Sequence, residues 1–148
     1  MTFKNLHKDV HIYREMPKGR KSPKSEMGEQ IDAYQDFITH HPELKLALFY
    51  VPNETQGASK NGKATGGALR HQKRMNEAGR SSGVSDLILL HQTKKYPYAV
   101  IEMKAKFHGA PSKEEKDFLN YHAERGAFAC ICWGFEQFKI AVNYYLQS

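Results

Sequence analysis

Cysteine is scarce in this sequence, since only Cys130 and Cys132 are present, separated by a single residue in an apolar stretch. Such a pair cannot build the disulfide framework on which small secreted domains depend, so that class is excluded. Long apolar runs are also missing, because none approaches the roughly 18 residues of a membrane-spanning helix. The N-terminal residues lack the apolar segment of a secretory signal. We therefore expect a cytoplasmic protein without a membrane partner.

Motifs for nucleotide cofactors and for serine hydrolases are absent as well. The sequence contains no Walker A loop, no dinucleotide-binding fingerprint and no GxSxG motif, so no organic cofactor is expected. Positive charge, in contrast, is in excess: 22 Lys and Arg residues against 16 Asp and Glu residues give a net charge of +6. A basic domain favours an anionic partner, and nucleic acid is the first candidate.

The length of 148 residues suits a single domain. Residues 1–25 are rich in Lys and Arg and contain Pro17, Gly19 and Pro23. This composition predicts a basic N-terminal arm, either flexible or lying as an extension along an edge of the fold. Residues 26–148 contain the periodic apolar segments, and we expect them to form the domain.

These segments predict an α/β fold. Apolar residues recur at helical spacing in 25–39, where Ser25 is a suitable N-cap, and short apolar runs indicate strands. The Gly-rich stretch 52–68 offers no core residues and is expected to be a long loop. Helices are predicted over 25–39, 69–78, 112–125 and 134–146, and strands over 45–51, 84–90, 97–104 and 127–133. A mixed central β-sheet flanked by helices is the packing that this order favours.

Three ionisable residues lie in two consecutive strands joined by a short polar turn. Glu102 and Lys104 are two residues apart in one strand, so their side chains point to the same face of the sheet. Asp86 lies near the start of the preceding strand, and in an antiparallel hairpin the start of one strand lies beside the end of the next. The pattern therefore predicts that Asp86, Glu102 and Lys104 converge.

Two crowded carboxylates in an apolar hairpin are costly unless a partner compensates them. A divalent cation relieves the repulsion, and hard cations such as Mg²⁺ prefer carboxylate ligands. A metal ion with an ammonium group beside it has the parts needed to activate water at a phosphate. The alternative is an ordinary surface ion pair between Lys104 and a carboxylate, which the spacing alone does not exclude.

The sequence around these residues resembles the VRR-NUC branch of the PD-(D/E)XK nuclease superfamily. Asp86 follows a short Gly-containing loop, Gly83-Val84-Ser85, as in that family, and Glu102-Met103-Lys104 matches its E-x-K motif. Further matches are Pro52-Asn53-Glu54 after the first strand of the domain and Tyr145-Leu146 at the end of the last helix.

The resemblance covers roughly residues 26–146 and implies a restriction-endonuclease-like core with elements in the order αβββαβ. It also implies a bound Mg²⁺ or Mn²⁺, held by Asp86, Glu102 and the backbone carbonyl of Met103. Lys104 would then position or activate water. Small stand-alone phage proteins belong to this branch, so a bacterial or phage-infected host cell is the expected setting.

The family also has a helical acid near the N-terminus, often followed by a Gln. Glu26 with Gln30 one turn later fits this pattern best, and Glu29 is the alternative. The sequence departs from the family at two positions, because Ser85 stands where a Pro is usual and Glu115 stands near the position of a Gln. Glu115 also completes a capping box with the start of its helix, and that structural role is sufficient to explain it.

Basic residues in the long loop, in the helix after it and beyond the E-x-K strand are candidates for contacts with DNA phosphates. They are Lys60, Lys63, Arg70, Lys73, Arg74, Arg80 and Lys106. Such contacts would provide affinity without sequence readout. A solvated helix face explains the charges of the helix equally well, and this alternative stays open.

The expected function is that of a metal-dependent endonuclease, which hydrolyses DNA phosphodiester bonds with Mg²⁺ or Mn²⁺. Stand-alone members of the branch resemble Holliday-junction resolvases, which makes branched DNA the expected substrate. Cutting both arms of a junction needs two active sites, so a homodimer is the expected assembly. The alternatives are a general or site-specific DNA nickase on the same fold and a DNA-binding module without catalysis.

Overall fold

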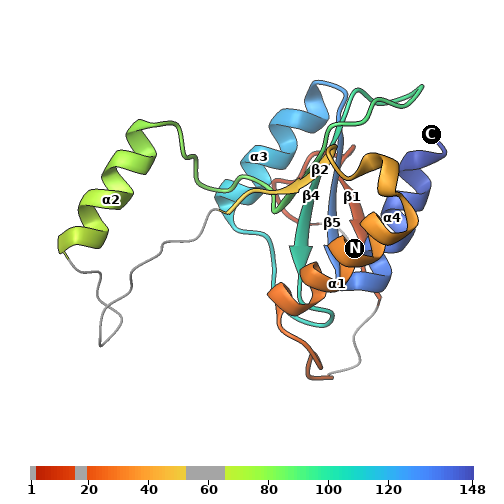
Figure 1. The fold of residues 1–148 in the computed structure, drawn as a ribbon, viewed down its shortest axis with the longest axis horizontal. Coiled ribbons are helices and arrows are strands. Elements are labelled where there is room, and N and C mark those ends of the chain that lie inside the picture. Colours follow the sequence, from red (N-terminus) through yellow and green to blue (C-terminus); the bar gives the residue numbers. More distant parts are fainter. Residues whose placement is uncertain (1–2, 16–19, 53–65) are drawn as a thin grey trace.

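The computed structural model of the protein describes residues 3–15, 20–52 and 66–148. At its centre lies a five-stranded sheet in the order β1-β5-β4-β3-β2 (Figure 1). The strands are β1 (His11–Tyr13), β2 (Leu48–Tyr50), β3 (Leu87–Leu89), β4 (Ala99–Lys104) and β5 (Phe128–Trp133). The helices are α1 (Glu26–His40), α2 (Gly66–Glu77), α3 (Lys113–Glu124) and α4 (Phe135–Leu146), with a short 3-10 helix at Pro42–Leu44.

The sheet is mixed, as the sequence predicts. β2, β3 and β4 form an antiparallel meander, whereas β5 lies parallel to β4 on one side and to β1 on the other. Every residue of β4 and of β5 is buried, because elements cover both faces of the sheet there. The order αβββαβ corresponds to α1, β2, β3, β4, α3 and β5, and the predicted fold class is confirmed.

Helices cover the two faces of the sheet and define three layers. α1 and α4 pack on one face, where Phe37, Ile101 and Phe138 belong to one apolar cluster. α3 packs on the other face, where Leu119 and Val100 belong to a second cluster. Successive residues of β4 alternate between these two clusters because strand side chains alternate in direction.

Side-chain caps fix the starts of two helices at the positions that the sequence predicts. The Ser25 hydroxyl accepts a hydrogen bond from the Gly28 N–H at 3.0 Å and begins α1. Ser112 and Glu115 form the expected capping box at the start of α3. Each cap pairs a backbone N–H that the first helical turn leaves without a partner.

The N-terminal segment contributes to the sheet. The sequence predicts an arm over residues 1–25, flexible or lying along an edge, and the structure places β1 there as an edge strand paired with β5. Apolar side chains explain this position, because Val10 is buried and Phe3 stacks on Trp133. Of the two alternatives predicted for this segment, a flexible arm and an extension along an edge of the fold, the second agrees with the position of β1. The division between an arm and a domain at residue 25 stays a prediction.

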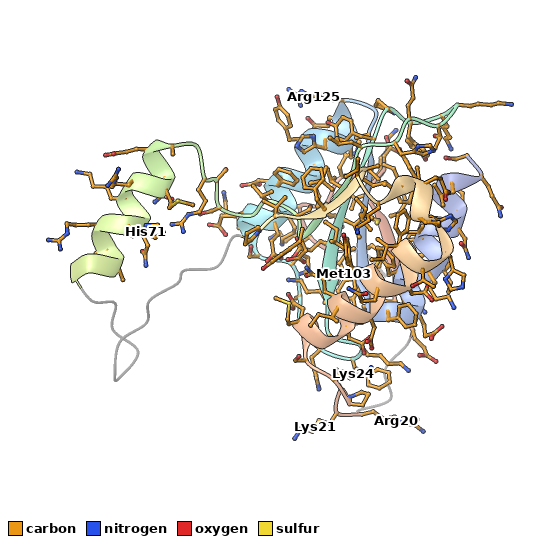
Figure 2. The ribbon with its side chains drawn as sticks, viewed as in Figure 1. Arg20, Lys21, Lys24, His71, Met103 and Arg125 are labelled. Carbon is orange, nitrogen blue, oxygen red and sulfur yellow. The ribbon has the colours of Figure 1, made fainter. Side chains whose placement is uncertain are left out.

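Two further segments differ from the sequence prediction in extent or in position. The predicted strand over 45–51 shortens to β2, because Pro42 starts a 3-10 turn that continues into a further turn. α2 begins at Gly66 instead of residue 69 and stands apart from the sheet and its helices (Figure 2, where His71 marks it). Within the described residues no helix is both long and apolar enough to cross a membrane.

Candidate metal centre

Four elements meet at one end of the sheet, where β2 and β4 end and β3 and α1 begin. The register pairs Leu87 with Ile101, which places Asp86 opposite Glu102 one residue farther along. The Met103 N–H donates a hydrogen bond to Asp86 Oδ2 at 2.7 Å and fixes the carboxyl group beside β4. The convergence predicted from the hairpin is thus present in the structure.

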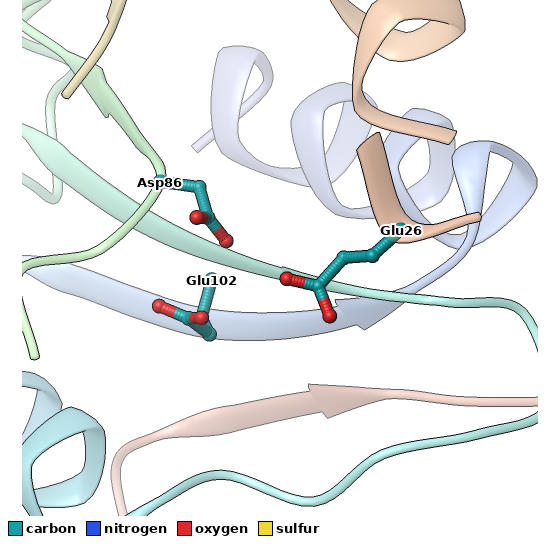
Figure 3. Close-up of side chains that lie close together, drawn as sticks. All are labelled: Glu26, Asp86 and Glu102. Carbon is teal, nitrogen blue, oxygen red and sulfur yellow. The ribbon is translucent and has the colours of Figure 1, made fainter. Parts of the chain in front are cut away.

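Glu26, the first residue of α1, adds a third carboxyl group. Glu26, Asp86 and Glu102 each offer one oxygen atom, and these atoms all lie within 4.8 Å of one another. Figure 3 shows the three carboxyl groups approaching one another from α1, the loop before β3, and β4. Glu102 is buried, Asp86 is half-buried and Glu26 is exposed, so the cluster reaches solvent on the Glu26 side.

Burial determines the protonation of the two carboxyl groups that belong to the hairpin. Glu102 is 3% exposed, and its Oε2 atom has no hydrogen-bond partner among the described residues. Desolvation, together with the charges of Asp86 and Glu115, raises the pKa of Glu102 to about 10. Desolvation also raises the pKa of Asp86, although the hydrogen bond from the Met103 N–H opposes this shift. Without a cation, the cluster therefore favours a protonated Glu102.

The donor set fits a hard divalent cation. The repulsion among Glu26, Asp86 and Glu102 is what such a cation relieves, and Glu102 Oε2 is a buried acceptor without a donor among the described residues. In the described part of the chain, the cluster contains neither Cys nor His, so its chemistry suits Mg²⁺ or Mn²⁺ better than zinc. The Met103 carbonyl, which the resemblance adds to the ligands, stays a prediction.

Lys104 lies beside the cluster and is buried. Its Nζ atom lies 3.4 Å from Glu102 Oε1 and donates a hydrogen bond to Glu115 Oε2 at 2.8 Å. Burial by itself lowers the pKa of Lys104, but the hydrogen bond to Glu115 and the charges of both glutamates outweigh burial, so the pKa is raised. Lys104 is therefore held as a cation next to the carboxyl groups.

Glu115 is a neighbour of the site for which the sequence predicted only a structural role. Its Oε2 atom accepts a hydrogen bond from the Ser112 N–H at 3.0 Å, as the capping box requires, and the same atom accepts from Lys104. One carboxyl group thus connects the start of α3 to Lys104. Only the resemblance could have indicated that Glu115 lies beside the site, because the family has a polar residue, Gln, near this position.

Two glycines let the neighbouring loops approach the site closely. At Gly83 φ is +79°, and a Cβ atom would lie 2.3 Å from the backbone of Glu114, so the loop before Asp86 packs directly on α3. At Gly109 φ is +92°, and a Cβ atom would lie 3.3 Å from the side chain of Lys104. A side chain at either position would therefore displace α3 or Lys104 beside the site.

Glu29, the alternative to Glu26, has another partner. Its Oε2 atom accepts a hydrogen bond from the Phe135 N–H at 2.8 Å and caps the first turn of α4. The N-cap residue of α4, Gly134, offers no side chain for this purpose. The geometry therefore favours Glu26 as the helical acid of the cluster and gives Glu29 a structural task.

The candidate DNA-contact residues lie in several places. Lys60 and Lys63 are outside the described residues. Arg70, Lys73 and Arg74 are exposed on α2, the helix that stands apart from the sheet and its covering helices (Figure 1). The chain leaves the site end of the sheet after β2 and returns to it at β3, so both flanks of α2 connect to that end.

Lys73 Nζ lies 3.9 Å from Glu77 Oε1 on α2, and the two remaining basic candidates also have partners. Arg80 donates a hydrogen bond from Nε to Asn76 Oδ1 at 3.0 Å, in the turn after α2. Lys106 Nζ lies 3.9 Å from Glu15 Oε2, beyond the end of β4. Neither residue is thereby excluded from contacting DNA, and their role stays a prediction.

Comparisons with known proteins identify the fold. A solved structure titled "VRR_NUC domain protein" matches with a TM-score of 0.69, over 86% of this chain and 92% of that chain, at 15% sequence identity. No family model matches the sequence, and no curated protein matches it. At this identity the likeness shows the fold, which agrees with the α/β core predicted from the resemblance.

Proposed function

We propose that this protein is a metal-dependent endonuclease that hydrolyses DNA phosphodiester bonds. The observation that carries the proposal is the convergence of Glu26, Asp86 and Glu102 beside the buried Lys104. The fold shared with the VRR_NUC domain protein supports it, because that protein is named for a nuclease domain. The net charge of +6 suits a nucleic-acid partner.

The residues of the site have distinct tasks in this proposal. The ligands of Mg²⁺ or Mn²⁺ are Asp86, Glu102, Glu26 and the Met103 carbonyl. When bound, the cation lowers the pKa of a water molecule and offsets charge on the phosphate. Lys104 orients the water or stabilises the negative charge that develops as water adds to phosphorus and a P–O ester bond breaks.

α2 and its flanking residues are proposed to contact phosphates. Arg70, Lys73 and Arg74 lie three and four residues apart, so they share one face of α2 and present a common positive surface. Lys60, Lys63, Arg80 and Lys106 are the further members of this proposed set. Contacts of this kind strengthen binding to any DNA sequence and weaken steeply as salt is added.

Branched DNA is the proposed substrate, and a homodimer is the proposed assembly. Two incisions at one junction require two acidic clusters on one DNA molecule, which a twofold dimer supplies. Sedimentation equilibrium with and without a four-way junction measures the assembly. A monomer in both conditions would contradict this part of the proposal and leave the nuclease part standing.

A cleavage assay tests the nuclease itself. The protein is incubated with a four-way junction, a linear duplex and a single strand, each in Mg²⁺, Mn²⁺ or EDTA. We expect cleavage only with metal, and symmetric incisions near the branch point of the junction. Single nicks in duplex of any structure would instead indicate the nickase.

Matched variants assign the activity to the site. Asp86→Asn and Lys104→Met each remove one group that the reaction needs, and we expect each to lower the rate at least about 100-fold. Glu124→Gln changes an exposed carboxyl on α3 and serves as the control with unchanged activity. DNA binding without cleavage in either metal by the unmodified protein would indicate a binding module and overturn the enzyme.

A further inference from the structure

A groove lined by apolar and aromatic side chains lies between α1 and the β2 edge of the sheet. It has a volume of about 280 Å³, comparable with the smallest sites for organic ligands, about 300 Å³. Its walls are formed mainly by Met27, Ile31, Tyr34, Phe49, Tyr50 and Leu87. None of the residues that line it is charged.

Four of the apolar and aromatic residues that line this groove are exposed to solvent, namely Met27, Ile31, Phe49 and Tyr50. Ile31 is 54% exposed and Phe49 is 41% exposed, although both lie on elements that pack against the core. Exposed apolar residues are common singly, but several that line one groove usually mark a binding surface. The groove is therefore a candidate site for a flat, uncharged group.

The groove adjoins the acidic cluster through the chain itself. Met27 follows Glu26 in α1, and Leu87 follows Asp86 at the start of β3. Tyr50 pairs with Leu87 across the two strands. A nucleic-acid strand whose phosphate lies at the cluster would therefore have a neighbouring nucleotide within reach of the groove.

The acidic cluster and the groove differ in charge, and this difference indicates which group binds in the groove. The cluster is suited, through a cation, to an anionic phosphate, whereas the groove offers aromatic and aliphatic surfaces without charge. Nucleobases bind to such surfaces by stacking when they are not paired. In a duplex both faces of a base are occupied by its neighbours, so only an unpaired base can enter.

We propose that the groove binds an unpaired nucleobase next to the scissile phosphate and thereby directs the enzyme to junctions of double and single strands. This inference rests on the proposed nuclease function; among branched DNA substrates it favours those with a single strand at the branch point over a fully paired four-way junction. A second copy of the chain is the competing occupant. The groove is lined by eight residues, far fewer than the roughly 20–30 residues that each partner contributes to a stable interface.

A thermodynamic cycle tests the proposal without cleavage. The probe is a fluorescein-labelled duplex with a single-stranded overhang, and an abasic site is placed in turn at each nucleotide around the junction. Binding is measured by fluorescence anisotropy in EDTA, for the unmodified protein and for Phe49→Ala. We expect Phe49→Ala to weaken binding of the intact probe about tenfold, and to have little effect when the abasic site occupies one particular position.

Further variants separate stacking from folding. Phe49→Tyr keeps an aromatic ring and should restore binding, and Ile31→Ala should weaken it through the opposite wall. Ile140→Ala removes an apolar side chain that is 52% exposed on α4 and should change nothing. Equal losses for intact and abasic probes at every position would overturn the proposal.

Sedimentation equilibrium and a cleavage assay distinguish base binding from dimerisation and from the nuclease activity itself. A dimer that dissociates on Phe49→Ala in sedimentation equilibrium would show a second copy in the groove and overturn base binding. Cleavage of the same probe with Mn²⁺ is scored separately. If the protein cleaves the probe but Phe49→Ala weakens binding of intact and abasic probes equally, only the groove proposal is wrong. If the loss on Phe49→Ala depends on the abasic site but no metal supports cleavage, the proposed nuclease function is wrong.

Discussion

The two faces of strand β4 are both buried, yet they differ in chemistry along the same six residues. On one face Ile101 and Met103 pack among the apolar side chains of α1 and α4. On the other face Val100 packs in the same way, but Glu102 and Lys104 bring charge to the end of the strand. The same strand thus carries part of the core on one face and the candidate site on the other.

The two faces contribute with opposite sign to the free energy of unfolding. Burial of Ile101 stabilises the fold, whereas burial of Glu102 desolvates a carboxyl group whose Oε2 atom has no donor within the described residues. Lys104 is compensated by the carboxylate of Glu115, but desolvation of a buried pair commonly cancels what the pairing contributes. Stability therefore does not account for the charge at this end of β4, whereas the proposed metal site does.

The apolar face should give the largest change in stability. Ile101 is 1% exposed in the middle of the sheet, and Ile101→Ala leaves a cavity there. We expect the free energy of unfolding to fall by about 2–5 kcal/mol, measured by urea denaturation in EDTA. Ile140→Ala on the surface of α4 is the control and should stay within about 0.5 kcal/mol of the unmodified protein. If Ile101→Ala lowered the free energy of unfolding as little as Ile140→Ala does, the apolar face of β4 would not be the stabilising one.

The neighbouring residue on the other face should respond with the opposite sign. At neutral pH Glu102 must bind a proton on folding, because its pKa is raised only in the folded state; Glu102→Gln removes this cost while Lys104 keeps its hydrogen bond to Glu115. In EDTA we expect the free energy of unfolding to rise by about 1–2 kcal/mol, together with loss of cleavage in Mg²⁺. A destabilised Glu102→Gln would show that Glu102 stabilises the fold, and the two faces of β4 would then not differ in this respect.

The effect of Glu102 on stability depends on pH in a defined direction. Its pKa is raised from 4.5 to about 10 in the folded protein, so the folded state binds the proton more tightly than the unfolded state does. This contribution to stability is complete below pH 4.5 and is lost as the pH rises toward 10. The advantage of Glu102→Gln in EDTA should therefore increase from pH 5 to pH 8.

The arrangement of the fold could be predicted from the sequence where local signals agree. Ser25 and Ser112 indicate helix starts, and the spacing of Asp86, Glu102 and Lys104 in a hairpin predicts their convergence. β1 could not be predicted, because basic residues, Pro and Gly dominate its segment and its apolar side chains find their partners only in the folded structure.

The site itself was predictable only in part. The sequence favours Glu26 over Glu29 only through Gln30 one turn later. The structural reason for the choice lies at the N-terminus of α4, more than 100 residues away, which Glu29 caps through Phe135. The contact between Glu115 and Lys104 likewise depends on how α3 docks on the sheet. The groove beside α1 leaves no motif at all, since its walls come from segments far apart in the chain.

Cation binding should depend on pH because a cation must displace the proton of Glu102. With its pKa raised to about 10, Glu102 is protonated at neutral pH before the metal binds. We expect the affinity for Mn²⁺ to rise with pH between 6 and 8, by up to about tenfold per unit for one proton released. Isothermal titration calorimetry in buffers of different ionisation enthalpy measures both quantities. Glu102→Gln is the control, and an affinity independent of pH in the unmodified protein would contradict the shift.

The smallest expected effect concerns the carboxyl group that joins α3 to the charged end of β4. Glu115→Gln keeps the capping box, which accepts either residue, but removes the charge beside Lys104. Because Lys104 keeps its contact with Glu102, we expect kcat to fall about tenfold or less with little change in KM. Lys104 would also lose part of what raises its pKa, so the high-pH limb of the rate profile should move to lower pH.

Ser112→Ala is the matched control, because it breaks the cap and leaves the charge of Glu115 in place. It should cost about 1 kcal/mol of stability without changing kcat. If Ser112→Ala and Glu115→Gln lowered kcat equally, the capping box alone would explain Glu115. The charged face of β4 would then consist of Asp86, Glu102 and Lys104 without help from α3.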